Sequence, residues 1–332
     1  MARFAIGVDL GGTNLRVAAV DTAGTLLETI TTNTAVARGR DSVIDEMCDA
    51  IEELRARHGK KQDAIAGIGI GVPGIIDMER GMLRESPNLP GWHDFPVREA
   101  IEQRLRTHVV LENDANAAAF GEMWMGAGQG SGSGDLCMVT LGTGVGGGLV
   151  LNGKVHHGMT GMAGELGHTT VYPDGHQCKC GNRGCLEEYA SATAVKRMAL
   201  EAVGEGRAPE LGRAMGANTE ITAQQVYQHW LRGDAAAKGI FDQVGTALGI
   251  ALAAWINALN LPMYVVGGGV AGAWEAFAPA MMREIAARSF VFKATNDGDA
   301  RRRTIITRAV LGGEAGLRGS ARLAMLQGET TS

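Results

Sequence analysis

One pattern occurs twice in this chain of 332 residues, and it limits what the chain can fold into. An apolar strand at residues 4–9 is followed by the turn Leu10-Gly-Gly-Thr-Asn14 and by a second strand at residues 15–20. The same order returns at residues 136–151, where Leu141-Gly142 lies 131 residues after Leu10-Gly11. Each hairpin opens a stretch in which strand and helix patterns alternate. The sequence therefore predicts a duplicated α/β fold, with two domains and a central cleft.

Glycine is more frequent here than in an average protein. The chain has 49 glycines without a collagen-like period, whereas the usual share is about 7%. Two stretches, starting at Gly69 and Gly142, match the pattern Gly-x-Gly-x-x-Gly, but neither opens a helix, so the sequence does not predict a dinucleotide cofactor. The two hairpin turns, which contain Thr13 and Thr143, are instead expected to hold phosphates with backbone N–H groups and hydroxyls.

Charge and hydropathy argue against two classes of partner. The formal net charge is −5, and the one dense basic run, Arg301-Arg302-Arg303, is expected to be a solvated strand entrance, so no nucleic acid is expected. Residues 243–274 carry no charge and are long enough to span a membrane. Because polar residues and glycines interrupt them, we expect a buried helix at residues 244–259 and a buried strand at residues 263–266. No secretory signal is visible, which predicts a cytoplasmic protein without membrane contact.

Three of the five cysteines lie in Cys178-Lys-Cys180-Gly-Asn-Arg-Gly-Cys185. Three thiols within eight residues, with glycines between them, are typical of a metal-binding knuckle. A disulfide would leave one of them unpaired and suits an oxidising compartment that nothing else in the sequence supports. The other two cysteines, Cys48 and Cys137, are expected in the core.

Zinc takes four ligands, so a fourth must lie near the three thiols. The candidates are His168 and His176, followed by His156 and His157. We prefer His168, because His176 is so close to Cys178 that its binding would strain the loop. A site of three cysteines and one histidine leaves no open position, which predicts a structural Zn²⁺ rather than a catalytic one.

Several motifs together resemble the ROK family of sugar kinases, and most of all its bacterial ATP-dependent glucokinases. In chain order they are Asp9-Leu-Gly-Gly-Thr-Asn14, Gly71-Val-Pro-Gly74, Glu112-Asn-Asp114, Leu141-Gly-Thr-Gly-Val-Gly-Gly-Gly148, Gly164-Glu-Leu-Gly-His168, the cysteine knuckle through Glu187, and Gly267-Gly-Gly269. The resemblance covers essentially the whole chain. The knuckle joined to Gly-Glu-Leu-Gly-His is its most specific part.

The resemblance implies an actin-like or hexokinase-type ATPase fold, in which two α/β domains are hinged around a cleft. Residues 1–113 with about 311–332 are expected to form a small domain, and residues 114–310 a larger one that carries the zinc knuckle. The family also contains repressors with an added N-terminal helix-turn-helix; this module is expected to be absent, because the first hairpin begins at residue 4. A homo-oligomer, a dimer or a tetramer, is also expected.

The resemblance also implies the reaction, in which ATP phosphorylates a hexose. Asp114 occupies the position of the family's general base, although an Asp ahead of an Ala-rich helix is also a good N-cap. Asp9 is expected to hold the Mg²⁺ of ATP through water. Phosphate contacts are carried over to Gly11, Gly12, Thr13, Asn14, Thr143 and Gly144, and the adenosine side to Gly267, Gly268 and Gly269.

Sugar hydroxyls are expected to be matched by fixed polar groups, because an unpaired buried donor is costly. The resemblance gives this role to the backbone of Gly74 and to the side chains of Asn113, Asp114, Glu165, His168 and Glu187; Asn88 is a further candidate that is equally typical of a turn. Glucose is the expected substrate. Other kinases of the family act on N-acetylglucosamine, N-acetylmannosamine, allose, fructose or mannose, and a sugar-sensing regulator without turnover is a further alternative.

Overall fold

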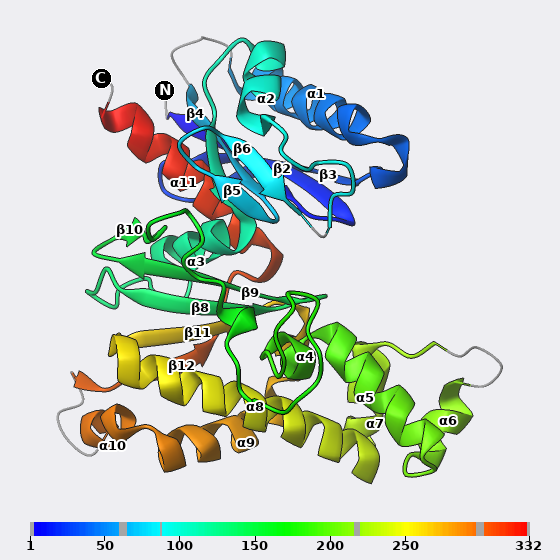
Figure 1. Cartoon of the computed structure of the whole chain (residues 1–332). Helices are drawn as coiled ribbons and strands as arrows, with labels where there is room; N and C mark the ends of the chain where they lie inside the picture. The colour runs from blue at the N-terminus through cyan, green and yellow to red at the C-terminus, as the bar shows by residue number, and fades with distance from the viewer. Residues whose placement is uncertain (1–2, 60–64, 87, 216–219, 297–301, 331–332) are drawn as a thin grey trace. The chain divides into compact units, whose positions relative to one another are not determined.

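The two glycine hairpins lie in two five-stranded sheets of matching strand order. The computed structural model describes residues 3–59, 65–86, 88–215, 220–296 and 302–330 (Figure 1). The sheets have the orders β3-β2-β1-β4-β7 and β10-β9-β8-β11-β12. In each, a glycine hairpin (β1–β2 or β8–β9) has a third strand on one side and two parallel strands on the other. The predicted duplication is therefore confirmed at the level of sheet topology.

The contacts of the chain divide it into two units. The N-terminal unit consists of Met1–Leu136, Gly148–Gly164 and Val310–Ser332, and the second unit of Cys137–Gly147 and Glu165–Ala309. The expected boundary at residue 114 differs from this division, since residues 114–136 and 148–164 group with the N-terminal unit. The reason is that α3 packs on α11 and β4 of that unit. The predicted domains, residues 1–113 with about 311–332 and residues 114–310, stay a prediction.

Most helices and strands lie wholly within one of the two units. Those of the N-terminal unit are β1 (Phe4–Leu10), β2 (Asn14–Asp21), β3 (Leu26–Asn33), η1 (Val36–Arg38), α1 (Arg40–His58), β4 (Ile65–Val72), β5 (Ile75–Asp77), β6 (Met82–Glu85), α2 (Val97–Leu105), β7 (Val110–Asn113), α3 (Asp114–Met125), β10 (Lys154–Val155), η6 (Gly312–Glu314) and α11 (Ala315–Thr330). The strands β8 (Leu136–Leu141) and β9 (Val145–Leu151) contain residues of both units.

The remaining elements belong to the second unit. They are η3 (Leu166–His168), α4 (Glu187–Ala190), α5 (Ala192–Gly204), α6 (Pro209–Met215), α7 (Ala223–Leu231), α8 (Ala235–Leu259), β11 (Met263–Gly267), η4 (Gly269–Ala273), α9 (Trp274–Arg288), α10 (Phe290–Asn296) and β12 (Ile305–Arg308). The predicted buried helix and strand are confirmed as α8 and β11.

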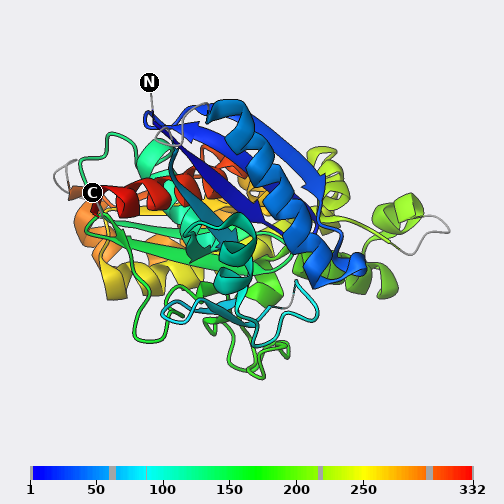
Figure 2. The same ribbon diagram turned by 90° about the horizontal axis from the view of Figure 1, so that it is seen from above.

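Side-chain alternation along β1 gives the first sheet two different faces. Every second residue from Phe4 to Leu10 is buried in a cluster with the apolar residues of α1 and α2. The opposite face carries small residues such as Ala5, and it packs on α11 through Leu317 and Ala321. Figure 2 shows α1 lying over the strands of this unit. Because side chains along a strand point alternately to the two faces, the large apolar residues lie on the face toward α1 and α2 and the small ones on the face toward α11.

The face with small residues lets helix backbones approach the sheet directly. A Cβ atom at Gly7 would lie 2.0 Å from the carbonyl oxygen of Leu317, and one at Gly69 would lie 1.9 Å from that of Ser320. The contact of α11 with α3 is equally close, because a Cβ at Gly319 would lie 1.7 Å from the carbonyl oxygen of Ala117. These glycines hold α11 against both the sheet and the first half of α3, the helix that begins at Asp114.

The far end of α3 is tied down by Glu122, whose side chain is fully buried. Its carboxylate accepts hydrogen bonds from the backbone N–H groups of Ala127 (2.8 Å), Val310 (3.0 Å) and Leu311 (2.7 Å). A protein tolerates a buried carboxylate when hydrogen-bond donors such as these satisfy its oxygens. Glu122 therefore links α3 to the point where the chain re-enters the N-terminal unit.

In the second unit, α8 packs on α9 through glycine. A Cβ at Gly245 would lie 2.2 Å from the carbonyl oxygen of Phe277, and one at Gly249 would lie 2.5 Å from that of Met281. Among the described residues, α8 is the one helix long and apolar enough to cross a membrane by length and composition, and most of its apolar stretch is buried inside the protein. The same apolar residues are needed for this packing.

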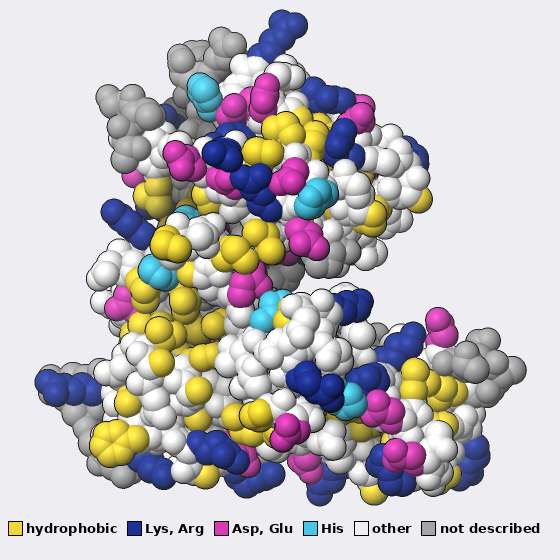
Figure 3. All heavy atoms as spheres, in the orientation of Figure 1, with side chains coloured by type: hydrophobic (Ala, Val, Ile, Leu, Met, Phe, Trp, Pro, Cys, Tyr) yellow, Lys and Arg dark blue, Asp and Glu magenta, His cyan; other side chains and the backbone are white. Residues whose placement is uncertain are grey.

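Surface charges of the two signs are interspersed. On the face drawn in Figure 3, Lys and Arg side chains alternate with Asp and Glu over each unit. Of the basic run, Arg302 and Arg303 are exposed just before β12, and Arg301 lies outside the described residues.

A glycine-to-alanine exchange tests the close packing of α11. Gly69→Ala should lower the free energy of unfolding by about 1–3 kcal/mol, because the new Cβ collides with backbone that has little room to shift. Gly239→Ala is the matched control: the site lies within α8 with no atom within 4 Å of the new Cβ. That change should be neutral or stabilising by up to about 1 kcal/mol. Thermal unfolding of both variants measures the difference, and a Gly69→Ala protein as stable as wild type would contradict the packing.

Candidate functional site

The proposed base lies where β7 gives way to α3 in the N-terminal unit. Asn113 is the N-cap of α3, and its Oδ1 accepts hydrogen bonds from the backbone N–H groups of Ala115 (2.9 Å) and Asn116 (3.2 Å). Asp114 is the first helical residue, and its Oδ1 accepts from the N–H of Ala115 at 2.8 Å. The cap assignment to Asp114 is therefore wrong. The strand continues through Asn113, which pairs with Val72, and this leaves Asn113 at the cap position.

Sheet geometry gathers the sequence-predicted residues of this unit at one edge. Parallel strands end on the same side, and Asp9 at the end of β1 pairs in register with Gly71 of β4. The Nδ2 of Asn113 donates to the carbonyl oxygen of Gly74 at 3.1 Å, so the turn after β4 and the start of α3 are joined. In open α/β sheets this carboxyl edge is where ligands bind.

The first glycine turn follows β1 at the same edge. The N–H of Gly11 donates to the carbonyl oxygen of Asn14 at 2.9 Å, and the exposed Thr13 accepts from the N–H of Thr34 through its carbonyl. Asn88 lies against this turn, because a Cβ at Gly12 would be 3.1 Å from its Cβ. The exposed Thr13 and Asn14 leave a turn that can accept a ligand from solvent.

Asp9 is paired inside this turn. Its Oδ2 accepts from Nη2 of Arg16 at 2.7 Å, and the same guanidinium donates to the carbonyl oxygen of Gly313. Burial raises the pKa of the Asp9 carboxyl, and Arg16 opposes that rise. The ion pair of Arg16 with Asp9 was not predicted from the sequence. The predicted hairpin could have suggested it, because Asp9 and Arg16 lie opposite each other on its two strands.

The second glycine turn follows β8 and is built from residues of the second unit. The N–H of Gly142 donates to the carbonyl oxygen of Gly144 at 2.9 Å, and the hydroxyl of Thr193 donates to the carbonyl oxygen of Thr143 at 2.7 Å. Glu187 accepts from the N–H of Val145 at 2.9 Å. The carboxylate of Glu187, at the start of α4, therefore lies directly on this turn.

A third glycine segment shares the edge of the second turn. Gly267 ends β11 and pairs in parallel with Thr140 of β8. Gly268 has a φ of +84°, which favours glycine. Gly268 and Gly269 are exposed. The three glycines and the β8–β9 turn thus lie at the carboxyl ends of neighbouring strands.

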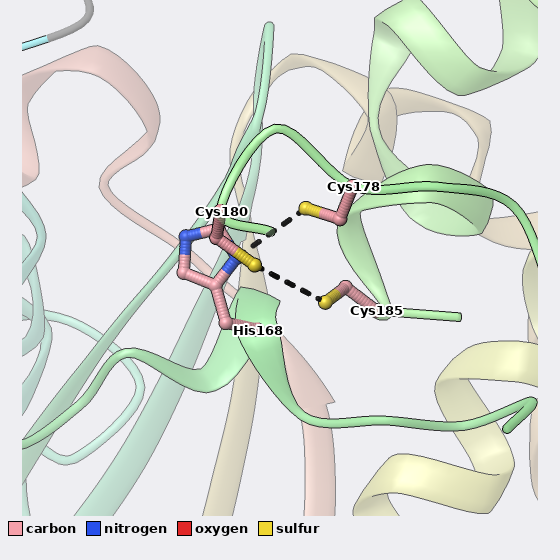
Figure 4. A group of neighbouring side chains, drawn as sticks. All are labelled: His168, Cys178, Cys180 and Cys185. Carbon is pink, nitrogen blue, oxygen red and sulfur yellow. Dashed lines mark hydrogen bonds between the residues drawn. The ribbon is translucent and has the colours of Figure 1, made fainter. Parts of the chain in front are cut away.

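The cysteine knuckle converges as predicted on His168. One ligand atom from each of His168, Cys178, Cys180 and Cys185 lies within 4.8 Å of every other (Figure 4). The Nδ1 of His168 is 3.7 Å from the Sγ of Cys178, and the Sγ atoms of Cys180 and Cys185 are also 3.7 Å apart. Burial raises the pKa of the Cys178 thiol to about 12. This group has the composition and spacing to hold a metal ion.

The other histidines considered for this role lie outside this group. His176 lies 2.9 Å from the guanidinium of Arg197 and packs on Tyr189. His157 lies 2.8 Å from Glu112 in the N-terminal unit. His156 is exposed and is not in the group of possible metal ligands.

Glu165 lies beside this group. Its Oε2 is 3.9 Å from Nε2 of His168, so the two nitrogens of the ring face a thiol and a carboxylate. Burial raises the pKa of Glu165, His168 lowers it, and the negative charge of Glu187 raises it further. Glu165, His168 and Glu187 therefore form one electrostatically connected set within the second unit.

Comparison with known proteins places the chain in a family. The sequence matches the ROK family over residues 5–327. The chain belongs to the ROK family. Glucokinases of Halalkalibacterium halodurans and Thermotoga maritima are 40% and 39% identical to it over 274 and 270 residues, covering 82% and 81% of this chain and 82% and 83% of the relatives.

A solved ROK structure matches the fold. The crystal structure of a ROK family glucokinase from Streptomyces griseus in complex with glucose and AMPPNP has a TM-score of 0.80 and 34% identity, and covers 97% of this chain and 99% of that chain. The expected family and the actin-like or hexokinase-type ATPase fold are confirmed.

Two variants separate the cap from the residue that follows it. Asn113→Ala should lower the free energy of unfolding by about 1 kcal/mol, the usual cost of losing an N-cap. Asp114→Asn should cost less, because an asparagine there keeps the Oδ1 that accepts from Ala115. Chemical denaturation measures both. A larger loss for Asp114→Asn than for Asn113→Ala would return the cap to Asp114.

Proposed function

We propose that this ROK protein is a glucokinase, which transfers the γ-phosphoryl group of ATP to the 6-hydroxyl of glucose. The observation that carries the proposal is the position of Asp114 at the carboxyl edge of the first sheet, next to Asn113, whose side chain donates a hydrogen bond to the carbonyl oxygen of Gly74. The names of relatives at about 40% identity over four-fifths of the chain support the same reaction.

In this mechanism Asp114 is the general base. Its carboxylate accepts the proton of the attacking hydroxyl, and its place at the first turn of α3 favours the ionised form through the helix dipole. Asn113 caps the helix and holds the Gly74 backbone, so the base and the sugar-facing turn are fixed together. Positioning of this kind is the main demand that phosphoryl transfer makes on a protein.

The glycine turns are proposed to hold the phosphates. Backbone N–H groups and hydroxyls of Gly11, Gly12, Thr13, Asn14, Thr143 and Gly144 supply donors, and Gly267, Gly268 and Gly269 the adenosine side. Asp9 is the carboxylate proposed to hold Mg²⁺ through water; burial raises its pKa, and the hydrogen-bonded Arg16 opposes that rise. Magnesium bound with ATP supplies neutralisation of the phosphate charge.

Sugar recognition is proposed for Gly74, Asn88 and Asn113 of the N-terminal unit and for Glu165, His168 and Glu187 of the second. A site that pairs a hydroxyl rejects an analogue without it, because its own polar groups are then left unpaired. The raised pKa of Glu165 is consistent with a carboxyl in such a partly dry site. The homo-oligomeric state and the cytoplasmic location stay predictions.

Structural zinc is proposed for the cysteine knuckle. Zinc–sulfur bonds of about 2.3 Å in a tetrahedron place two ligand sulfurs about 3.8 Å apart, and the 3.7 Å between the Sγ atoms of Cys180 and Cys185 matches this spacing. A disulfide would need the sulfurs about 2.05 Å apart. Binding through Nδ1 of His168 would leave its Nε2–H facing Glu165, which fixes the tautomer on the sugar side.

The reaction and the base are tested in one assay. With ATP and Mg²⁺, the purified protein should phosphorylate glucose with a higher kcat/KM than it shows for mannose, fructose, allose or N-acetylglucosamine. Asp114→Asn should lower kcat by about 10²–10⁴-fold and leave glucose binding largely intact, because the amide cannot accept the proton. A coupled assay of ADP release measures turnover, and calorimetry measures binding.

Two outcomes would contradict this proposal. A higher kcat/KM for another hexose would make the protein a kinase of that sugar and leave the base assignment standing. Near-normal turnover by Asp114→Asn would remove Asp114 from its role whatever the sugar.

Metal content tests the knuckle. The protein should contain about one zinc per chain, and Cys180→Ser should lose both metal and glucose affinity, because His168 and Glu165 then lack their anchor. Cys48→Ser is the control, since Cys48 lies in α1 away from the knuckle. Elemental analysis of active enzyme that finds no zinc would end the zinc assignment.

A further inference from the structure

Glu112 is a buried carboxylate next to the proposed base, and nothing in the proposed mechanism uses it. Its side chain is 4% exposed at the end of β7. Burying a carboxylate in a protein is costly unless donors surround it. What surrounds Glu112 therefore indicates why it is there.

Three donors reach this carboxylate. Its Oε1 accepts from the backbone N–H of Asn113 at 2.9 Å and from Nδ2 of Asn116 at 3.1 Å. Its Oε2 lies 2.8 Å from Nε2 of His157. Because an ionised carboxylate only accepts hydrogen bonds, the ring nitrogen of His157 must carry the proton that lies between them.

His157 comes from a distant part of the chain. It follows β10, in the stretch 148–164 that belongs to the N-terminal unit and ends immediately before Glu165. Glu112 and His157 are 45 residues apart in sequence, and the side chain of His157 is 36% exposed. The pair thus fastens a surface segment to the interior of the β7–α3 junction.

Glu112 contacts the residues on both sides of the proposed base, Asn113 and Asn116. Asn116 lies on the first turn of α3, and Asn113 is the cap of the same helix, so both residues held by Glu112 flank Asp114. A helix start fixed by its cap and by a residue of its first turn has little freedom to rotate. The direction of the Asp114 carboxylate follows from that of the helix start.

We propose that His157 is a positioning residue for phosphoryl transfer, which acts through Glu112 to hold the β7–α3 junction and with it Asp114. This inference rests on the proposed function for its kinetic consequence. The pair itself and its effect on the junction can be measured without turnover.

The pair gives the junction a pH dependence with a defined sign. The Glu112 carboxylate raises the pKa of His157 above its usual value, mainly through their hydrogen bond, against the opposing effect of burial. The charged pair is therefore complete below the ordinary histidine pKa and is lost as pH rises through the raised pKa. Among the described residues, Glu112 is the charged partner found for His157; Asn113 and Asn116 are uncharged, and Asp114 is the next carboxylate along the chain.

Two substitutions of His157 separate its charge from its hydrogen bond. His157→Ala should lower kcat with glucose about tenfold, since small displacements of a catalytic group have effects of this size or larger. His157→Gln keeps a donor that cannot titrate, so its kcat should lie between those of wild type and His157→Ala. Wild-type kcat should fall as pH rises through the pKa of His157, and this fall should be absent in His157→Gln.

The matched control is His108→Gln. His108 is a histidine of the same unit that also faces a glutamate, Glu102, at 3.4 Å, but its side chain is fully exposed. This change should leave kcat and its pH profile as in wild type. Wild-type kcat in His157→Ala, or an unchanged alkaline fall in His157→Gln, would overturn the proposal. If His157→Ala fails to fold by circular dichroism, the glutamine variant decides alone.

A titration followed by NMR keeps this inference separate from the glucokinase assignment. In wild type without sugar, the imidazole signals of His157 and the backbone amide signals of Asn113 and Asp114 should shift over one pH range. In Glu112→Gln, the imidazole should titrate at lower pH and the two amides should no longer follow it. Failure of wild type to phosphorylate glucose would remove the proposed function only, whereas amides that ignore the titration of His157 would remove the positioning role.

Discussion

Direct contact between backbones, made possible by missing Cβ atoms, is the constraint on which the N-terminal unit depends. Gly7 and Gly69 on the sheet and Gly319 on α11 bring helix and strand backbones closer than any other residue would allow. Dense packing of this kind resists small displacements, because each change in volume is felt by its neighbours. The start of α3 inherits that rigidity, and with it the residues of the β7–α3 junction.

Buried carboxylates supply the second level of organisation. Glu112 and Glu122 lie just before α3 and near its end, and each is satisfied by donors from remote parts of the chain. In the second unit a half-buried carboxylate has a similar role, since Glu187 accepts a hydrogen bond from the N–H of Val145 in the turn after β8. In all three cases a carboxylate accepts a hydrogen bond from a backbone N–H group at a turn or at the end of a helix.

The sequence predicted the elements well because their signals are local. Runs of apolar residues mark the strand at residues 4–9 and the buried helix and strand at residues 244–266, and the cysteine spacing marks the knuckle. The cap of α3 was misassigned because Asn113 and Asp114 are both good caps, and the choice depends on how far β7 pairs with β4. The pairs Glu112–His157 and Asp9–Arg16 were missed, because nothing in the local pattern marks a partner that the fold supplies.

The position of α11 in chain order has a consequence for synthesis. This helix follows all other described elements of both units, yet it covers one face of the first sheet, including Ala5 and Gly7. A nascent chain leaving the ribosome therefore presents that face uncovered while the entire second unit is being translated, and exposed sheet faces of this kind invite aggregation. The N-terminal unit can therefore complete this packing only after residues 315–330 have left the ribosome.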